Sequence, residues 1–113
     1  MSQLEAFCIT IGIEVLVAMG MTTLISVPSI ARVLLAVVLG TVLTHPLLWA
    51  VADRIPSDWW WPTIFALEVV IGVVEGVVVV VMGRVPWRGG LLIGVIMNAV
   101  SFGLGLLLAP LWT

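Results

Sequence analysis

Charged residues are scarce in this chain of 113 residues, at 9% of the sequence against 63% hydrophobic residues. A soluble domain carries roughly a quarter charged residues, so a soluble fold of this size would leave apolar side chains over most of its surface. Basic residues are especially few, since Lys and Arg together number 4 and the net charge is −2. That balance excludes the basic footprint of a nucleic-acid-binding protein.

Cysteine is represented by Cys8 alone. A single cysteine excludes an internal disulfide, and it excludes zinc or iron–sulfur ligation by four cysteines of one chain. Neither a Ser-His-Asp arrangement nor the H-E-x-x-H zinc pattern occurs. The sequence therefore names no catalytic residues.

Apolar residues instead form four long runs, at residues 6–25, 33–52, 63–82 and 91–108. A helix needs about 20 apolar residues to cross a bilayer, and the segments between the runs carry Pro, Gly and Arg, which punctuate helices. Short links favour an antiparallel order of helices. The sequence predicts an all-α polytopic membrane protein, an antiparallel four-helix transmembrane bundle that fills residues 1–113 as a single transmembrane domain.

The placement of arginine predicts the orientation. Arg32, Arg84 and Arg88 lie in the first and third loops, whereas Arg54 in the second loop is offset by two aspartates. The positive-inside rule then places loops one and three in the cytoplasm. The first run contains Glu14 and lacks a basic segment before it, so we expect a retained helix rather than a cleaved signal.

Polar residues interrupt the predicted spans. They are Glu14, His45, Glu68, Glu75, Asn98 and Ser101. An ionised carboxylate at the bilayer centre costs several kcal/mol, so such residues normally face the bundle interior or a water-filled cavity. All four arginines lie at span ends and none lies within a span. We therefore expect the glutamates to share an interior site without a basic partner.

Helical periodicity places these residues on one stripe of each helix. The stripes are Thr10, Glu14 and Ala18; Thr41, Thr44 and His45; Glu68, Gly72 and Glu75; and Gly94, Asn98, Ser101 and Gly105. At 1.5 Å per residue, one tier lies about 9 to 13 Å below one membrane face and a second lies about 17 to 20 Å below it. The first tier comprises Glu14, His45, Glu68 and Ser101, and the second comprises Thr41, Glu75 and Asn98.

Two local patterns carry further expectations. Pro46 follows His45 and removes a backbone donor, which predicts a local break of the helix at residues 44–46. Gly72 and Gly76 fit a close-packing motif that favours a dimer.

The structural alternative is that the polar residues only join helices. Asn98 and Ser101 can form interhelical hydrogen bonds, each worth under about 1 kcal/mol. A glutamate is different, because glutamine would provide the same contact without a charge that must be desolvated or protonated. We therefore assign Glu14, Glu68 and Glu75 a functional role.

Three chemistries fit this residue set. The first is proton or cation transport or binding, at Glu14, His45, Glu68, Glu75, Asn98 and Ser101. The second is a divalent metal ion held by Glu14, His45, Glu68 and Glu75. The third is an intramembrane enzyme that uses a Glu/His site as acid or base. A structural role, as accessory subunit of a larger membrane complex, also stays open. One chain of four helices encloses little volume, so besides the lipid bilayer we expect a homo-oligomer or a larger complex as partner.

Two resemblances carry expectations of their own. The order Thr44-His45-Pro46, Glu68, Glu75, Asn98-Ala-Val-Ser101 and a following glycine resembles small uncharacterised bacterial four-span membrane proteins, most of which have Thr-Asn-Pro at the first motif. This likeness covers the last three spans, implies a bacterial inner-membrane location, and implies no activity.

The length, the four spans and Glu14 followed by Thr22-Thr23 are also similar to the small multidrug resistance transporters. That resemblance implies a dimer that exchanges protons for cationic drugs at the first-helix glutamate. The additional membrane acids, His45 and the missing aromatic pattern in the second and third spans depart from that family.

Overall fold

The computed structural model describes residues 2–112, and it describes side chains through residue 108. The elements are α1 (Gln3–Met21), α2 (Ile30–Ala52), the short 3-10 helix η1 (Ser57–Trp59), α3 (Trp60–Gly83) and α4 (Trp87–Trp112). In this part of the chain four helices are long and apolar enough to cross a membrane. The predicted all-α class and membrane bundle are confirmed, and the chain is an integral membrane protein.

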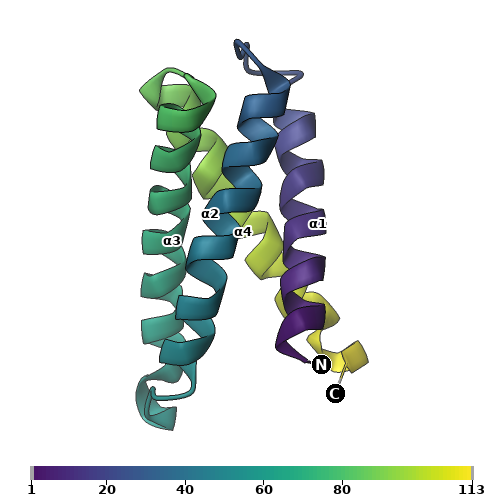
Figure 1. Cartoon of the computed structure of the whole chain (residues 1–113). Helices are drawn as coiled ribbons and strands as arrows, with labels where there is room; N and C mark the ends of the chain where they lie inside the picture. The colour runs from purple at the N-terminus through teal and green to yellow at the C-terminus, as the bar shows by residue number, and fades with distance from the viewer. Residues whose placement is uncertain (1, 113) are drawn as a thin grey trace.

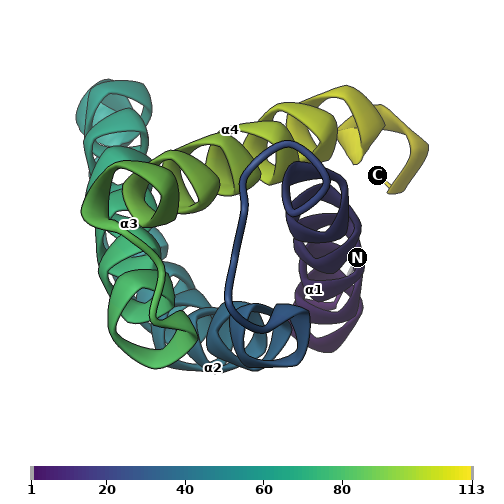
Figure 2. The same cartoon turned by 90° about the horizontal axis from the view of Figure 1, so that it is seen from above.

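The four helices form a ring in which each packs against its two neighbours along the chain, and α4 closes the ring against α1 (Figure 2). Both termini and the α2–α3 connection lie at one end of the bundle, which we call the terminal end (Figure 1). The α1–α2 and α3–α4 connections lie at the opposite end, which we call the loop end. In Figure 1, α4 crosses obliquely from α3 at the loop end to α1 at the terminal end.

Local capping sets the bounds of α1 and α2. The Ser2 hydroxyl accepts from the Glu5 backbone N–H at 3.1 Å, and the Glu5 carboxylate accepts from the Ser2 N–H at 3.4 Å. This capping box starts α1 before residue 6, where the apolar run begins. The Thr22 hydroxyl donates to the Met19 carbonyl at 2.7 Å as α1 ends. In α2 the Ser29 hydroxyl caps the Arg32 N–H.

Aromatic and glycine residues that looked like loop sequence belong to helices. The first turn of α3 contains Trp60, Trp61 and Pro62, and proline is tolerated there because the N–H of a first-turn residue has no intrahelical partner. The α4 helix begins at Trp87 rather than near residue 91, and the Gly90 N–H donates to the Pro86 carbonyl at 2.9 Å.

The predicted break at Pro46 is wrong, because α2 continues without interruption from Ile30 to Ala52. Pro46 removes only the N–H that would donate to the Val42 carbonyl, and the helix continues past this one missing bond. On the preceding turns Thr41 also donates to the Val37 carbonyl at 3.0 Å and Thr44 to the Gly40 carbonyl at 2.9 Å. His45 therefore extends from a continuous helix.

Glycines bring the backbones of α3 and α4 into direct contact. A Cβ on Gly94 would lie 2.3 Å from the Gly76 nitrogen and 2.7 Å from the Gly72 carbonyl oxygen. A Cβ on Gly90 would lie 2.2 Å from a Val80 methyl group. The close-packing motif at Gly72 and Gly76 is thus occupied by α4 of the same chain, so it supplies no free surface for a dimer.

The apolar core lies at the loop end of the bundle. Its buried members are Ala18, Val33, Ala36, Val37, Val79, Val85, Ile93 and Met97. They come from all four helices and from the α3–α4 connection. This layer closes the bundle at the loop end, whereas the polar stripes lie toward the terminal end.

Gly94→Ala is expected to destabilise the bundle, because the added methyl group meets backbone atoms of α3 that a side-chain rotation does not relieve. Overpacking of this kind costs about 1–3 kcal/mol. Thermal unfolding of the detergent-purified protein should show a lower midpoint. Gly103→Ala on the same helix is the control, because nothing lies within 4 Å of its Cβ position. Equal midpoints for the two variants would contradict the close packing of α3 and α4.

Candidate functional site: a buried carboxyl cluster

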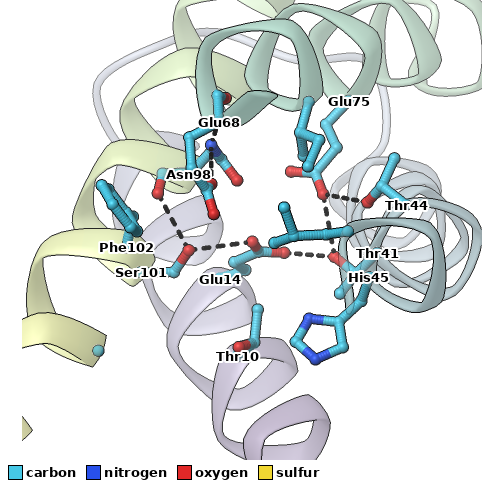
Figure 3. Close-up of a pocket in the computed structure, with 13 residues that line it drawn as sticks. Thr10, Glu14, Thr41, Thr44, His45, Glu68, Glu75, Asn98, Ser101 and Phe102 are labelled. Atoms are coloured by element: carbon cyan, nitrogen blue, oxygen red, sulfur yellow. Dashed lines mark hydrogen bonds between the residues drawn. The ribbon is translucent and has the colours of Figure 1, made fainter. Parts of the chain in front are cut away.

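The polar cluster adjoins the apolar core on the side toward the terminal end. Its buried members are Glu14, Thr41, Thr44, Glu75, Asn98 and Ser101. Each helix changes from core to cluster over one helical turn, as the pairs Ala18/Glu14 and Val37/Thr41 illustrate. The prediction that the polar stripes face the interior is confirmed for these six residues, which the four helices bring to one place (Figure 3). Of the other stripe residues, Thr10, His45 and Glu68 are partly buried and Gly105 is exposed.

Glu14 of α1 is the centre of the cluster. Its side chain is 1% exposed, and its two carboxylate oxygens contact hydroxyl groups from two other helices. Thr41 of α2 donates to Oε2, and Ser101 of α4 donates to Oε1 at 3.1 Å. Three helices therefore converge on one carboxyl group through hydroxyl donors.

Glu75 of α3 is 2% exposed and less completely satisfied. Its Oε1 lies 3.1 Å from the Thr44 hydroxyl and 3.5 Å from the Thr41 hydroxyl. Its Oε2 is buried without any hydrogen-bond partner among the described residues. Gly40 makes room for this side chain, because a Cβ there would lie 3.3 Å from Glu75 Cγ. Thr41 thus lies between the carboxyl groups of Glu14 and Glu75, and Glu75 Oε2 is the carboxyl oxygen without a donor.

Glu68 forms a separate pair with Asn98. The Asn98 amide nitrogen donates to Glu68 Oε2 at 2.8 Å and to the Glu68 backbone carbonyl at 2.7 Å. Both amide hydrogens of Asn98 are used in this way, so the amide fixes the Glu68 side chain against α4. Glu68 is only partly buried, unlike Glu14 and Glu75.

His45 lies at the edge of the cluster. Its Nε2 accepts from the Trp49 indole N–H at 2.7 Å, and Phe7 of α1 packs edge-on against the imidazole at 5.4 Å between ring centroids. Among the described side chains, no hydrogen bond joins the imidazole to a glutamate. An Nε2 atom that accepts from an indole is unprotonated, because indole nitrogen only donates.

No arginine balances the cluster within residues 2–108. The Arg32 guanidinium donates to the Met82 carbonyl at 3.2 Å, at the loop end. Arg84 forms the left-handed C-cap of α3, with φ of 53°. The prediction of membrane carboxyl groups without a basic partner is confirmed for Glu14 and Glu75.

The cluster lines an open cavity of about 140 Å³. Its walls are Thr10, Glu14, Thr41, Thr44, His45, Leu48, Glu68, Ile71, Glu75, Asn98, Ser101, Phe102 and Gly105. A water molecule takes up about 30 Å³ of the liquid, so the cavity has room for a few waters. The lining residues extend from Thr10, Leu48 and Gly105, toward the terminal end, to Glu14, Thr41, Glu75 and Asn98 near the middle of their helices. The apolar core lies beyond them, toward the loop end.

An apolar groove of about 380 Å³ lies between α3 and α4. It shares three residues with the cavity, namely Glu68, Asn98 and Phe102. These side chains therefore form a common wall between the polar interior and the lipid-facing side of the bundle.

The two predicted tiers are not separate in the structure. Glu14 of the first tier bonds Thr41 of the second, and Asn98 of the second tier bonds Glu68 of the first. The depth estimate assumed upright helices that start at one membrane plane, whereas α4 crosses the bundle obliquely (Figure 1). The glutamates and Ser101 do share one cavity, as predicted, and His45 lines its edge.

The metal set of Glu14, His45, Glu68 and Glu75 stays a prediction. Within residues 2–108, no group of three or more His, Cys, Asp or Glu side chains is arranged to hold a metal ion. The glutamates instead accept hydrogen bonds from hydroxyl and amide groups, which are neutral donors.

Thr41 and Thr44 were on the predicted stripe but not among the predicted site residues, and the structure places both on Glu75. The sequence signal that could have identified them is their position on the same helix face as His45: Thr41 lies one turn before it and Thr44 directly precedes it. A threonine in a membrane helix usually bonds its own backbone, so its sequence gives no sign of a second, carboxyl acceptor.

The fold and the cluster define a small four-helix membrane protein with buried carboxyl groups. Comparison with known proteins finds no matching family model, no matching curated protein and no matching solved structure. The chemistry of the cluster is therefore the basis for a functional assignment.

One-sided access to the cluster can be tested with cysteine variants in a Cys8→Ser background, since Cys8 is exposed. Thr10→Cys lines the open cavity, whereas Ala18→Cys on the same helix lies in the apolar core with 0% exposure. A charged thiol reagent should modify Thr10→Cys much faster than Ala18→Cys in proteoliposomes, because the reagent needs a water-filled path. Equal rates, read by mass spectrometry, would contradict the cavity.

Proposed function

We propose that this small integral membrane protein handles protons or cations, by transport or by ion binding, through its intramembrane glutamates. The observation that carries the proposal is the pair of buried carboxyl groups of Glu14 and Glu75, joined through one hydroxyl and left without a basic partner. Isolated buried carboxylates are costly enough that they take up a proton or pair with a cation. Glu75 Oε2, buried and unpartnered, provides an acceptor for either.

The position of the cavity supports transport over mere packing. The cavity that the carboxyl groups line extends toward the terminal end, and the core layer of Ala18, Val37, Val79 and Met97 separates it from the loop end. A carrier exposes its site to one side at a time. The described arrangement corresponds to one such state, and transport requires a second state in which the core layer opens or a second copy of the chain contributes a path.

The proton is the cargo that the ligand set favours. A divalent metal ion is usually held by three or more ligands, and among the side chains of residues 2–108 no three His, Cys, Asp or Glu are arranged to hold one. Hydroxyl groups that link carboxyl groups provide hydrogen-bonded routes for protons instead.

Location, orientation and assembly are part of the same proposal. The chain lies in a bacterial inner membrane, with loops one and three in the cytoplasm according to the positions of Arg32, Arg84 and Arg88. The cavity then opens to the outside of the cell. The protein acts as a homo-oligomer or within a larger membrane complex. The resemblance to small bacterial four-span membrane proteins is consistent with this location.

An intramembrane enzyme is the second candidate, and one observation favours it. The apolar groove between α3 and α4 reaches the Glu68–Asn98 pair from the lipid side. A lipid-like substrate in that groove would place its polar end beside a carboxyl group able to act as acid or base. Lipid density or a co-purified lipid in the groove, together with a reaction product, would favour this activity.

Glu75→Gln is expected to abolish proton movement in proteoliposomes, because an amide neither releases nor takes up a proton at physiological pH. Glu14→Gln should do the same, and Glu68→Gln should reduce it. The measurement is the change in a pH-sensitive dye enclosed in the vesicles after a pH step. Glu5→Gln is the control, since Glu5 is exposed at the start of α1.

A wild-type rate that equals the rate of empty vesicles, or Gln variants at both Glu14 and Glu75 that move protons at the wild-type rate, would refute proton transport through these glutamates. Unchanged thermal unfolding midpoints in the variants would show that the loss concerns the site rather than folding. Tolerance of Gln at every membrane acid, with co-purification of another protein, would instead support an accessory subunit.

A further inference from the structure

We infer that Glu14 and Glu75 hold a single proton between them, with Glu75 as the neutral acid and Glu14 as the anion. The inference deepens the proposed function and rests on it only for its physiological meaning, because the proton count follows from the hydrogen bonds themselves. Each hydroxyl carries one hydrogen, a carboxylate carries none, and every buried polar atom is expected to find a partner.

Hydroxyl hydrogens are too few for two anions. Thr41 can donate its one hydrogen to Glu14, to Glu75 at 3.5 Å or to the Val37 carbonyl at 3.0 Å. Thr44 chooses between Glu75 at 3.1 Å and the Gly40 carbonyl at 2.9 Å. With both glutamates ionised, Glu14 takes the Thr41 hydrogen, Glu75 retains at most one donor, and Glu75 Oε2 is an anionic oxygen with none.

A proton on Glu75 Oε1 resolves the count. The acid hydrogen then points at the Thr44 or Thr41 oxygen, and Thr44 is free to donate to the Gly40 carbonyl. Thr41 donates to Glu14 Oε2. Ser101 can give its one hydrogen to Glu14 Oε1 or to the Asn98 backbone carbonyl, both at 3.1 Å, and an anionic oxygen is the stronger acceptor. The only unpaired atom is Glu75 Oε2, now the oxygen of a neutral acid, whose unpaired burial costs less than that of an anion.

The reverse assignment is less favourable. If Glu14 held the proton, Glu75 would be the anion, and the charge would lie on a carboxylate whose Oε2 has no donor. Glu14 in contrast has a hydroxyl donor on each oxygen, from α2 and from α4. The difference in donors between the two carboxyl groups therefore places the charge on Glu14.

The surroundings supply no charge that would alter this assignment. Glu68 on α3 and His45 on α2 are the other titratable groups that line the cavity, and α4 contributes only Asn98 and Ser101 as polar side chains there. No Lys or Arg lines the cavity. No neighbouring helix therefore contributes a cation that would stabilise two negative charges, and protonation of one of the two glutamates is favoured.

Thr41 gives the pair a route for proton transfer. When a proton arrives on Glu14 Oε2 from the cavity, that acid hydrogen can pass to the Thr41 oxygen while the Thr41 hydrogen passes to Glu75 Oε1. One O–H bond forms and one breaks at the hydroxyl, and the net result is transfer of one proton from Glu14 to an ionised Glu75. The hydroxyl reverses its donor direction in the process.

The test is isotope-edited infrared spectroscopy of the protein in lipid at neutral pH, with glutamate labelled at its side-chain carboxyl carbon. Protonated and ionised carboxyl groups absorb in separate regions. We expect an acid band that is lost in Glu75→Gln and retained in Glu14→Gln, whereas Glu14→Gln loses carboxylate absorption. Glu5→Gln controls for labelling, and Glu68→Gln identifies any acid signal that belongs to Glu68.

Absence of an acid band that depends on Glu75, or its loss in Glu14→Gln but not in Glu75→Gln, would overturn the assignment. Thr41→Ser should keep the wild-type position of the Glu75 band, and Thr41→Val should shift it, because valine leaves Thr44 as the only hydroxyl beside Oε1. The infrared result is independent of flux: a Glu75 acid band in a protein that moves no protons would refute proton transport and leave the shared proton in place.

Discussion

The organising constraint of this protein is the burial of carboxyl groups in a bundle that provides no cation to balance them. Glu14 and Glu75 lie almost completely out of contact with solvent, and their partners are hydroxyl groups of Thr41, Thr44 and Ser101. Neutral donors stabilise a carboxylate less than a guanidinium would. A proton or a bound cation would therefore stabilise these carboxyl groups more than the hydroxyl donors do. This distinguishes the site from a contact that only packs helices together.

The positions of the carboxyl groups depend on close approach of the helix backbones. Gly72, Gly76 and Gly94 allow α3 and α4 to touch, and this contact sets Asn98 against Glu68. Gly40 provides the corresponding space on α2 for Glu75. Small residues in membrane helices usually serve association alone; here they also set the depth and direction of the acids.

The sequence predicts the helices and their inward faces well, because both depend on local composition and on a fixed period. The polar stripes of Glu14, Glu75 and Asn98 follow from spacing alone, and burial confirms them. The pairing between helices does not follow, because it depends on the tilt and depth of each helix. The oblique course of α4 (Figure 1) brings Asn98 to Glu68, and Glu14 of α1 meets Thr41 of α2 across the expected tiers. The continuous helix at Pro46 was likewise missed, since proline removes one backbone hydrogen bond and the bonds of the neighbouring turns are enough to keep α2 helical.

The interlocked glycines have a mechanical consequence. Where backbone meets backbone with no side chain between them, neither α3 nor α4 can slide or rotate without a collision. These two helices are expected to move as one rigid body that carries Glu75, Glu68 and Asn98 together. The α1 helix, with open space at Gly12 and Gly20, lacks such an interlock at those positions and brings Glu14 alone. Any rearrangement that exposes the acids to the loop end would then separate α1 from the α3–α4 unit, and the distance between the two carboxyl groups would change with it.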